Sequence, residues 1–226
     1  MRAFAFGLFR TAWVPRASLW TALLLGPALA DAGTFTVTNT LDGGGGSLRQ
    51  AILLANTNPG PDVIDFSIPG AGGRVIQPLM DLPPITDPVR IDGTTQPGYA
   101  GSSLIEISGN LGTNVHGLRI ESSNSIVAGL AITRFDGIGA AGLVISGPQA
   151  MENWIYGNQI GLDATGTNIA PNFDGIVLVN GAQHNLIGTD GNGTNDLEER
   201  NLISGQLAAG VTIFNAHSNR VAGNYI

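Results

Sequence analysis

Short motifs recur along this chain at a spacing that restricts the folds it can adopt. The pattern Asn-x-[Ile/Val]-x-Gly-Asn-x-Ile occurs at residues 153–160 and again at residues 219–226. A second pattern, Asn-x-Ile-Gly-x-Asp-x-x-Gly-Thr, occurs at residues 158–167 and 185–194. A glycine followed by three mostly aliphatic residues begins at Gly117, Gly142, Gly175 and Gly210. These glycines are 25, 33 and 35 residues apart, and repeats of this period are typical of solenoids.

Each repeat unit consists of short strands and tight corners, without a helical pattern. The chain contains 33 glycines, and 43% of its residues are hydrophobic, a composition that fits many short strands joined by turns. We therefore predict an all-β fold, a parallel β-helix whose stacked coils bury continuous aliphatic ladders. The residues expected to point inward are Leu143, Ile145, Ile155, Ile160, Ile176, Leu178, Ile187, Ile203, Val211 and Ile213.

Asparagine recurs at the corners of these units. The positions are Asn124, Asn153, Asn158, Asn185, Asn201 and Asn219. Asparagine tolerates the left-handed backbone that corners need. An amide that points inward can bond to the corner backbone and to the asparagine one coil away, which satisfies buried polar groups. We predict that these side chains form structural ladders; the alternative is a polar surface that binds a ligand.

One short helix is predicted before the repeats. Ser47 followed by Gln50 is the start of a capping box, and an apolar helical face follows over roughly residues 47–57. That face consists of Leu48, Ala51, Ile52 and Ala55. The end of a β-helix has unpaired strand edges that must be covered, so we expect this helix to cap the first coil.

The first 32 residues have the layout of a secretory signal peptide. Three arginines precede the apolar stretch of residues 19–29, and small-x-small sequences that fit a cleavage site lie at residues 28–30 and 30–32. The apolar stretch is too short to span a bilayer, so an integral membrane protein is not expected. We expect a protein that is secreted or held at the cell surface.

The charged residues and the absence of cysteine exclude several function classes. All ten basic residues are arginine, against 17 acidic residues, and the formal net charge is −7 at pH 7. No stretch gathers the arginines into a basic patch, so no nucleic-acid partner is expected. The lack of cysteine excludes disulfides, thiol nucleophiles and Cys-ligated zinc.

The motifs suggest a division of the chain into three parts. Residues 1–32 are the signal peptide, residues 33–116 are the N-terminal cap with the first coils, and residues 117–226 are the β-helix repeats. The last motif copy continues with Gly161 in its first occurrence but stops at Ile226 in its second. From this we expect that the repeats are truncated at their C-terminal end and continue in a longer protein.

Four segments together resemble a known family. They are residues 47–52 (SLRQAI), 91–99 (IDGTTQPGY), 157–167 (GNQIGLDATGT) and 199–205 (ERNLISG). Over about residues 34–226 the chain resembles the exported bacterial β-helix repeat proteins with a CSLREA-type N-terminal region, within the pectin-lyase-like superfamily. The cysteine that opens that N-terminal motif is missing here. The resemblance implies a right-handed, single-stranded parallel β-helix in a secreted or cell-surface protein, and it implies no particular activity.

Two groups of residues are candidates for binding sites. Trp154 and Tyr156 flank the inward Ile155, so both should face outward, where they can stack on sugar rings or lie flat on a neighbouring coil. Oxygen-bearing side chains alternate along a glycine-rich loop at Asp190, Asn192, Thr194 and Asp196. Calcium prefers such ligands and is the one cofactor that the sequence suggests, with Glu198 and Glu199 able to complete the shell. The alternative for this loop is an Asx-rich turn.

The evidence for catalysis in the sequence is weak. A polysaccharide lyase needs a base, commonly arginine or lysine, beside calcium-binding carboxylates, and Arg119, Glu121, Arg134 and Asp136 are the residues that could share a face. Solvated charges on outward strand positions have the same spacing. We therefore expect a β-helix scaffold or adhesin-like protein without a catalytic site. The alternatives are a polysaccharide-active enzyme of the lyase or epimerase type and a carbohydrate-binding β-helix; in each case the partner is an extracellular polysaccharide or cell-surface glycan.

Overall fold

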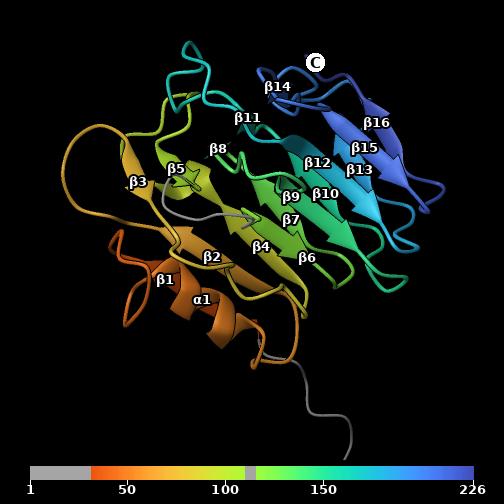
Figure 1. Ribbon diagram of the computed structural model, residues 1–226. Helices are drawn as coiled ribbons and strands as arrows, with labels where there is room; N and C mark the ends of the chain where they lie inside the picture. Colours follow the sequence, from red (N-terminus) through yellow and green to blue (C-terminus); the bar gives the residue numbers. More distant parts are fainter. Residues whose placement is uncertain (1–31, 110–115) are drawn as a thin grey trace, which may run out of the picture.

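The computed structural model describes residues 32–109 and 116–226, and it shows a parallel β-solenoid with one α-helix (Figure 1). The all-β parallel β-helix with a small helix, predicted from the repeats, is confirmed. The predicted signal peptide lies outside the described residues except for Ala32. In the described part, no helix is long and apolar enough to cross a membrane.

Three parallel sheets form the sides of the solenoid. Sheet A contains, in spatial order, β1 (Thr34–Val37), β2 (Asp62–Phe66), β4 (Val89–Asp92), β7 (Ile126–Ala128), β10 (Trp154–Tyr156), β13 (Leu186–Gly188) and β16 (Arg220–Ala222). Sheet B contains β3 (Arg74–Ile76), β5 (Ile105–Ser108), β8 (Leu130–Thr133), β11 (Gln159–Ile160) and β14 (Leu202–Ile203). Sheet C contains β6 (Leu118–Ile120), β9 (Ala141–Ser146), β12 (Asp174–Val179) and β15 (Val211–Phe214).

The core consists of aliphatic residues stacked in register from coil to coil. In sheet B, for example, Ile107, Ile132, Ile160 and Ile203 are successive partners, and all four are buried. Eight of the ten residues predicted to point inward are buried. The other two lie on β15, which pairs only with β12. Val211 is partly buried and Ile213 is 46% exposed, because no described coil stacks on that side.

Amide ladders hold the corners between sheets A and B and before sheet A. Along one corner, the side-chain oxygen of Asn185 accepts from the backbone N–H of Asn153 at 3.0 Å, and that of Asn219 accepts from Asn185 at 3.0 Å. Along the other, the oxygen of Asn201 accepts from the N–H of Asn158 at 3.1 Å. The amide nitrogens donate onward to the next oxygen or to carbonyl groups of the preceding coil. Each ladder therefore satisfies backbone groups that no strand pairing reaches.

The asparagine pattern of the sequence does not describe the ladders fully. Asn124 is exposed, with a φ of 56°, so it takes the left-handed corner role, and the backbone N–H of the adjacent Ser125 donates to Asn153. Asn224 extends one ladder beyond Asn201. A third ladder, between sheets B and C, consists of Asn172 and Gln206.

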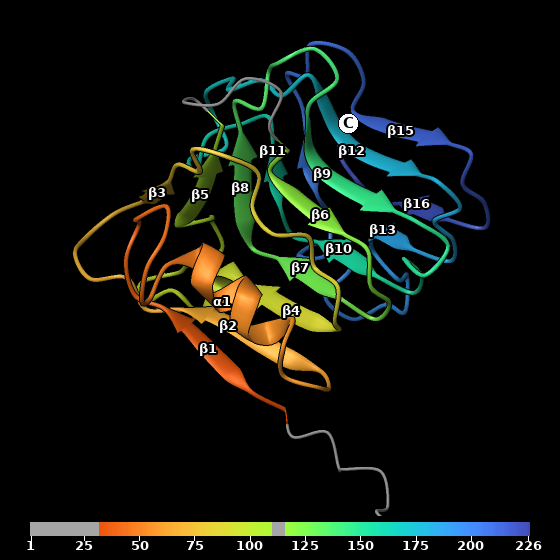
Figure 2. The ribbon, with the colours of Figure 1, turned by 60° about the horizontal axis from the view of Figure 1, so that its bottom comes forward.

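The helix α1 (Leu48–Ala55) lies across the first coil beside β1 and β2, as Figure 2 shows. Ser47 is its N-cap and accepts a hydrogen bond from the N–H of Gln50 at 3.2 Å. The buried face is the one predicted: Leu48, Ala51, Ile52 and Ala55. The helix therefore covers apolar surface at the N-terminal end of the solenoid.

The ladders make a direct prediction about stability. In Asn158→Ala, the N–H of Leu130 loses its acceptor, and the side-chain oxygen of Asn201 loses one of its donors. A buried polar group without a partner costs about 1–3 kcal/mol, so we expect the free energy of unfolding to fall by at least about 2 kcal/mol in urea titrations.

The matched control is Asn124→Gly, which removes an exposed amide and keeps the left-handed backbone. It should change the unfolding free energy by less than about 1 kcal/mol. Equal effects of the two substitutions would contradict the ladder role of Asn158.

Candidate functional site

The outward aromatic pair lies in the middle of sheet A. Trp154 and Tyr156 flank the buried Ile155 on β10, and both are half-buried. Their ring centroids are 4.4 Å apart with a 43° angle between the ring planes. The indole N–H of Trp154 donates to the carbonyl oxygen of Gly188 on the next coil at 2.7 Å. The indole is thus fixed across two coils, and part of each ring stays open to a ligand.

Arginine and aspartate border this aromatic pair. In register along the sheet, Arg90 and Arg220 lie on either side of Trp154, each separated from it by one aliphatic residue. Arg90 forms an ion pair with Asp92 at 2.7 Å and also interacts with Tyr156. Small residues lie beside the pair: Ala128 is the register neighbour of Tyr156 on β7, and Gly188 on β13 accepts from the Trp154 indole. The surface combines flat apolar rings with hydrogen-bond donors, a combination suited to sugars.

Only part of the predicted calcium loop converges. The carboxylates of Asp190 and Asp196 approach that of the buried Glu199, with one oxygen of each within 4.8 Å of the others. Asn192 and Thr194 are exposed; Asn192 donates to the Asp190 carboxylate, and the Thr194 N–H donates to Asn192.

The same three carboxylates accept hydrogen bonds from the loop itself. Glu199 accepts from the N–H of Asp190 at 3.1 Å, and Asp196 accepts from the Thr189 hydroxyl at 2.8 Å and the Gly193 N–H at 3.1 Å. Calcium takes six to eight oxygen ligands, which come from carboxylates, carbonyl groups and water, and three carboxylates supply only part of such a set. The arrangement therefore has the features of an Asx-type turn, with Glu199 as the additional acid that joins Asp190 and Asp196.

The four charged residues considered for catalysis do not share one face. Arg119 and Glu121 form an ion pair at 2.7 Å on the outer side of β6. Arg134 instead pairs with Glu106 of β5 at 2.6 Å, and Asp136 is exposed and forms neither pair. Arg134 has a φ of 59°, so its side chain leaves the corner after β8 in a direction that strand alternation does not give.

A cavity of about 150 Å³ lies beside the Arg119–Glu121 pair. Asp81 and His116 also line it, and Asp81 accepts a hydrogen bond from the backbone N–H of His116 at 2.7 Å. The imidazole Nδ1 accepts from the N–H of Ala141 at 3.1 Å, so the neutral ring carries its proton on Nε2. Burial lowers the pKa of His116 below 6.5. Sequence analysis missed this cavity because Asp81 and His116 lie in loops without a motif.

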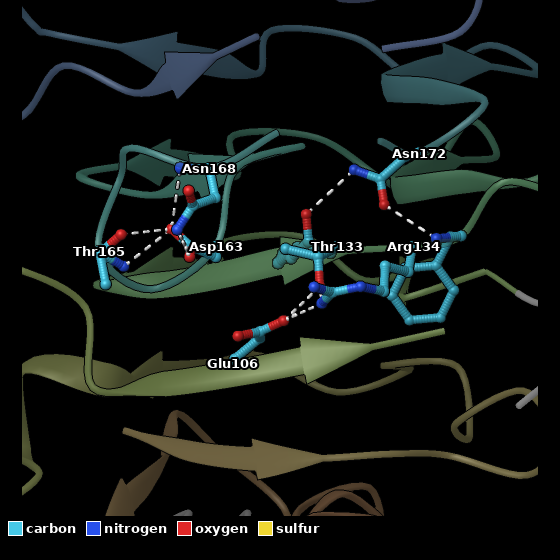
Figure 3. A network of polar contacts seen from close by, with 9 residues as sticks. Glu106, Thr133, Arg134, Asp163, Thr165, Asn168 and Asn172 are labelled. Carbon is cyan, nitrogen blue, oxygen red and sulfur yellow. Dashed lines mark hydrogen bonds and ion pairs between the residues drawn. The ribbon is translucent and has the colours of Figure 1, made fainter. Parts of the chain in front are cut away.

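Two separate polar clusters occur on sheet B and in the loop that follows β11 (Figure 3). The buried Glu106 carboxylate accepts from the Thr133 hydroxyl at 2.7 Å and from Arg134 at 2.6 Å. In the loop, Asp163 accepts from the Thr165 hydroxyl at 2.6 Å and from the Asn168 amide at 2.7 Å. These bonds lower the pKa of Asp163 to about 2. Glu106 therefore links β5 to the end of β8, and Asp163 holds the conformation of its own loop, so both acids have a structural role.

Comparison with known proteins gives no family to this chain. No protein-family model, no curated protein and no solved structure matches it. The structure establishes the parallel β-helix architecture, and a fold alone does not assign an activity.

The hydrogen bonds from Thr165 and Asn168 to the Asp163 carboxylate can be tested by titration. The folded pKa of about 2 lies below the ordinary 3.8, so the loop contributes stability above pH 3.8 that is lost as the pH falls through about 2. Thr165→Val should move the carboxyl midpoint of Asp163 toward 3.8 in a carbon-13 NMR titration. An unchanged midpoint would show that the threonine hydroxyl does not hold this carboxylate.

The lowered pKa of His116 gives a second titration test, in which the folded state again loses stability as the pH falls. Because burial favours its neutral form, the stabilising effect of this ring is complete above its unfolded pKa of 6.5 and is lost as the pH falls through the lower folded pKa. In a proton NMR titration, His116 should titrate at lower pH in the folded protein than in a urea-unfolded sample. A higher midpoint in the folded protein would exclude the buried, neutral ring.

Proposed function

We propose that this chain is the β-helix scaffold of an exported protein of the adhesin type, which binds an extracellular glycan without changing it chemically. The observation that supports this most directly is the Trp154–Tyr156 pair, fixed on a rigid sheet with its rings partly open. Aromatic rings offer large apolar area at low conformational cost and often keep a polar group at one end. The signal-peptide pattern of residues 1–32 supports export of this scaffold.

The pairing of charges supports binding over catalysis. Four arginines of the described part, Arg49, Arg90, Arg119 and Arg134, each lie within 2.7 Å of a carboxylate. A guanidinium that donates to a carboxylate offers five N–H donors and no lone pair with which to accept a proton, as a base must. Arg119 and Arg134, the two arginines that the sequence offers as bases, both donate to a carboxylate in this way.

The aromatic pair can be tested by substitution. Trp154→Ala and Tyr156→Ala should each weaken glycan binding by about tenfold or more, since each removes a large apolar contact surface; tenfold corresponds to about 1.4 kcal/mol. Binding is measured by calorimetry against a panel of neutral and acidic polysaccharides. Phe214→Ala, which removes an exposed aromatic ring on β15, is the control. Unchanged binding by both sheet A variants would contradict the proposal.

A polysaccharide lyase or epimerase is the second candidate function, and the cavity beside β6 favours it. This cavity holds a neutral imidazole, a carboxylate and an Arg–Glu pair within one small volume. The test is the appearance of unsaturated sugar ends, followed by absorbance, and its loss in His116→Ala. Product that persists in His116→Ala would place any chemistry elsewhere.

A further inference from the structure

A second cavity lies at the corner between sheets A and B. It has a volume of about 270 Å³, and the side chains that line it include Tyr99, Gln159, Glu198, Arg200 and Tyr225, with Leu197 and Leu202 as apolar neighbours. Its residues come from the loop after β4, the corner after β10, the loop before β14 and the end of the described chain. No single motif contains them all, although Gln159 and Tyr225 occupy the same position in the two copies of the first motif.

Tyr225 forms an open platform at this cavity. Its hydroxyl accepts a hydrogen bond from Nη1 of Arg200 at 2.8 Å, and the guanidinium carbon lies 5.2 Å from the ring centroid. The side chain is 58% exposed, on the last described coil, which has no further coil stacked on it. Arg200 orients the ring on the side of the preceding coil by a cation–π contact, and both residues line the cavity.

Tyr99 provides a second aromatic side chain with a fixed protonation state. Burial, and then the charge of Asp92, raise the pKa of Tyr99 above 10, so its hydroxyl is a hydrogen-bond donor at neutral pH.

Two backbone segments that line the cavity approach each other closely at Gly157. A Cβ on Gly157, which has a φ of 63°, would lie 2.9 Å from the Glu198 carbonyl oxygen. A side chain at this corner would therefore displace the segment that carries Glu198 and Arg200.

The charges at the cavity indicate what kind of ligand fits. Arg200 and Glu198 contribute one positive and one negative charge, and among the described residues Arg200 forms no ion pair with a carboxylate. The whole chain carries a net charge of −7, which repels an anionic polymer. A sugar hydroxyl can donate to the Glu198 carboxylate while its neighbour accepts from Arg200. The volume is slightly below the range of about 300–1,000 Å³ for enclosed small-molecule sites, which suits one unit of a chain that continues outside.

We propose that this corner cavity binds an uncharged sugar unit of an extracellular polysaccharide, with Tyr225 and Tyr99 as apolar contacts and Glu198 and Arg200 as hydrogen-bonding partners. The inference rests on the proposed glycan-binding function and adds a site to it. Tyr156 of the outward pair precedes Gln159 by three residues, so their α-carbons lie within about 11 Å. One glycan chain can therefore contact the aromatic pair on sheet A and enter the cavity around the corner.

The test maps binding by nitrogen-15 NMR on the purified protein. The probes are cellohexaose, laminarihexaose, maltohexaose and mannohexaose, with hexagalacturonate as the charged comparison. We expect at least one neutral hexasaccharide to shift the amide signals of Gly101, Gly157 and Leu202, which line the cavity. We also expect Tyr225→Ala and Glu198→Gln to weaken its binding by about tenfold, and hexagalacturonate to bind more weakly.

The control is Phe214→Ala, which removes an aromatic ring outside the cavity and should bind as the parent protein does. Circular dichroism melts verify that each variant is folded. A neutral glycan that shifts only the Trp154 indole, and loses affinity in Trp154→Ala but not in Tyr225→Ala, would overturn the cavity site and leave the proposed function standing. Preferred binding of hexagalacturonate would overturn the uncharged ligand, and no binding of any probe would contradict both proposals.

Discussion

Satisfaction of the corner backbone is the constraint on which this structure depends. Parallel strands of two to six residues leave N–H and C=O groups at every bend without strand partners. Amide side chains fill this need three times, in the ladders through Asn153, Asn158 and Asn172. Each amide binds the coil before and the coil after, so the ladders also keep the coils in register. With the register fixed, the outward side chains of successive coils align in rows.

The aligned rows explain why a chain with few charges can present a defined surface. Arg90, Trp154 and Arg220 share one outward row, and Asp92 and Tyr156 share the next. Asp92 also accepts from the N–H and hydroxyl of Thr94, and Arg220 donates to the Asp190 carbonyl oxygen in the loop after β13. The corner cavity extends this surface because Gly157 lets the segment of Glu198 come close. The scaffold and the candidate binding surface are thus consequences of the same stacking.

The features with a regular spacing along the chain were predictable from the sequence, and the contacts that arise only when coils stack were missed. The inward aliphatic rows follow from strand alternation within motifs that occur more than once, and the face of α1 follows from helical spacing. The ladder of Asn172 and Gln206 was not predicted because it mixes two residue types in loops of different length. The two cavities were not predicted because their lining residues come together only when coils stack: Asp81 meets His116 in one cavity, and Tyr99 meets Arg200 in the other. Arg134 pairs with Glu106 and not with Glu121, a contact that the sequence does not reveal because the left-handed backbone at this corner redirects the side chain.

The central claim is that the β-helix binds an extracellular glycan and leaves it intact. The direct measurement is the size distribution of a polysaccharide that the immobilised protein retains, determined by chromatography with light scattering before and after prolonged incubation. Retention with an unchanged chain length, and without absorbance from unsaturated ends, is the result that this account predicts. Shortened or unsaturated product would contradict it and make the protein an enzyme.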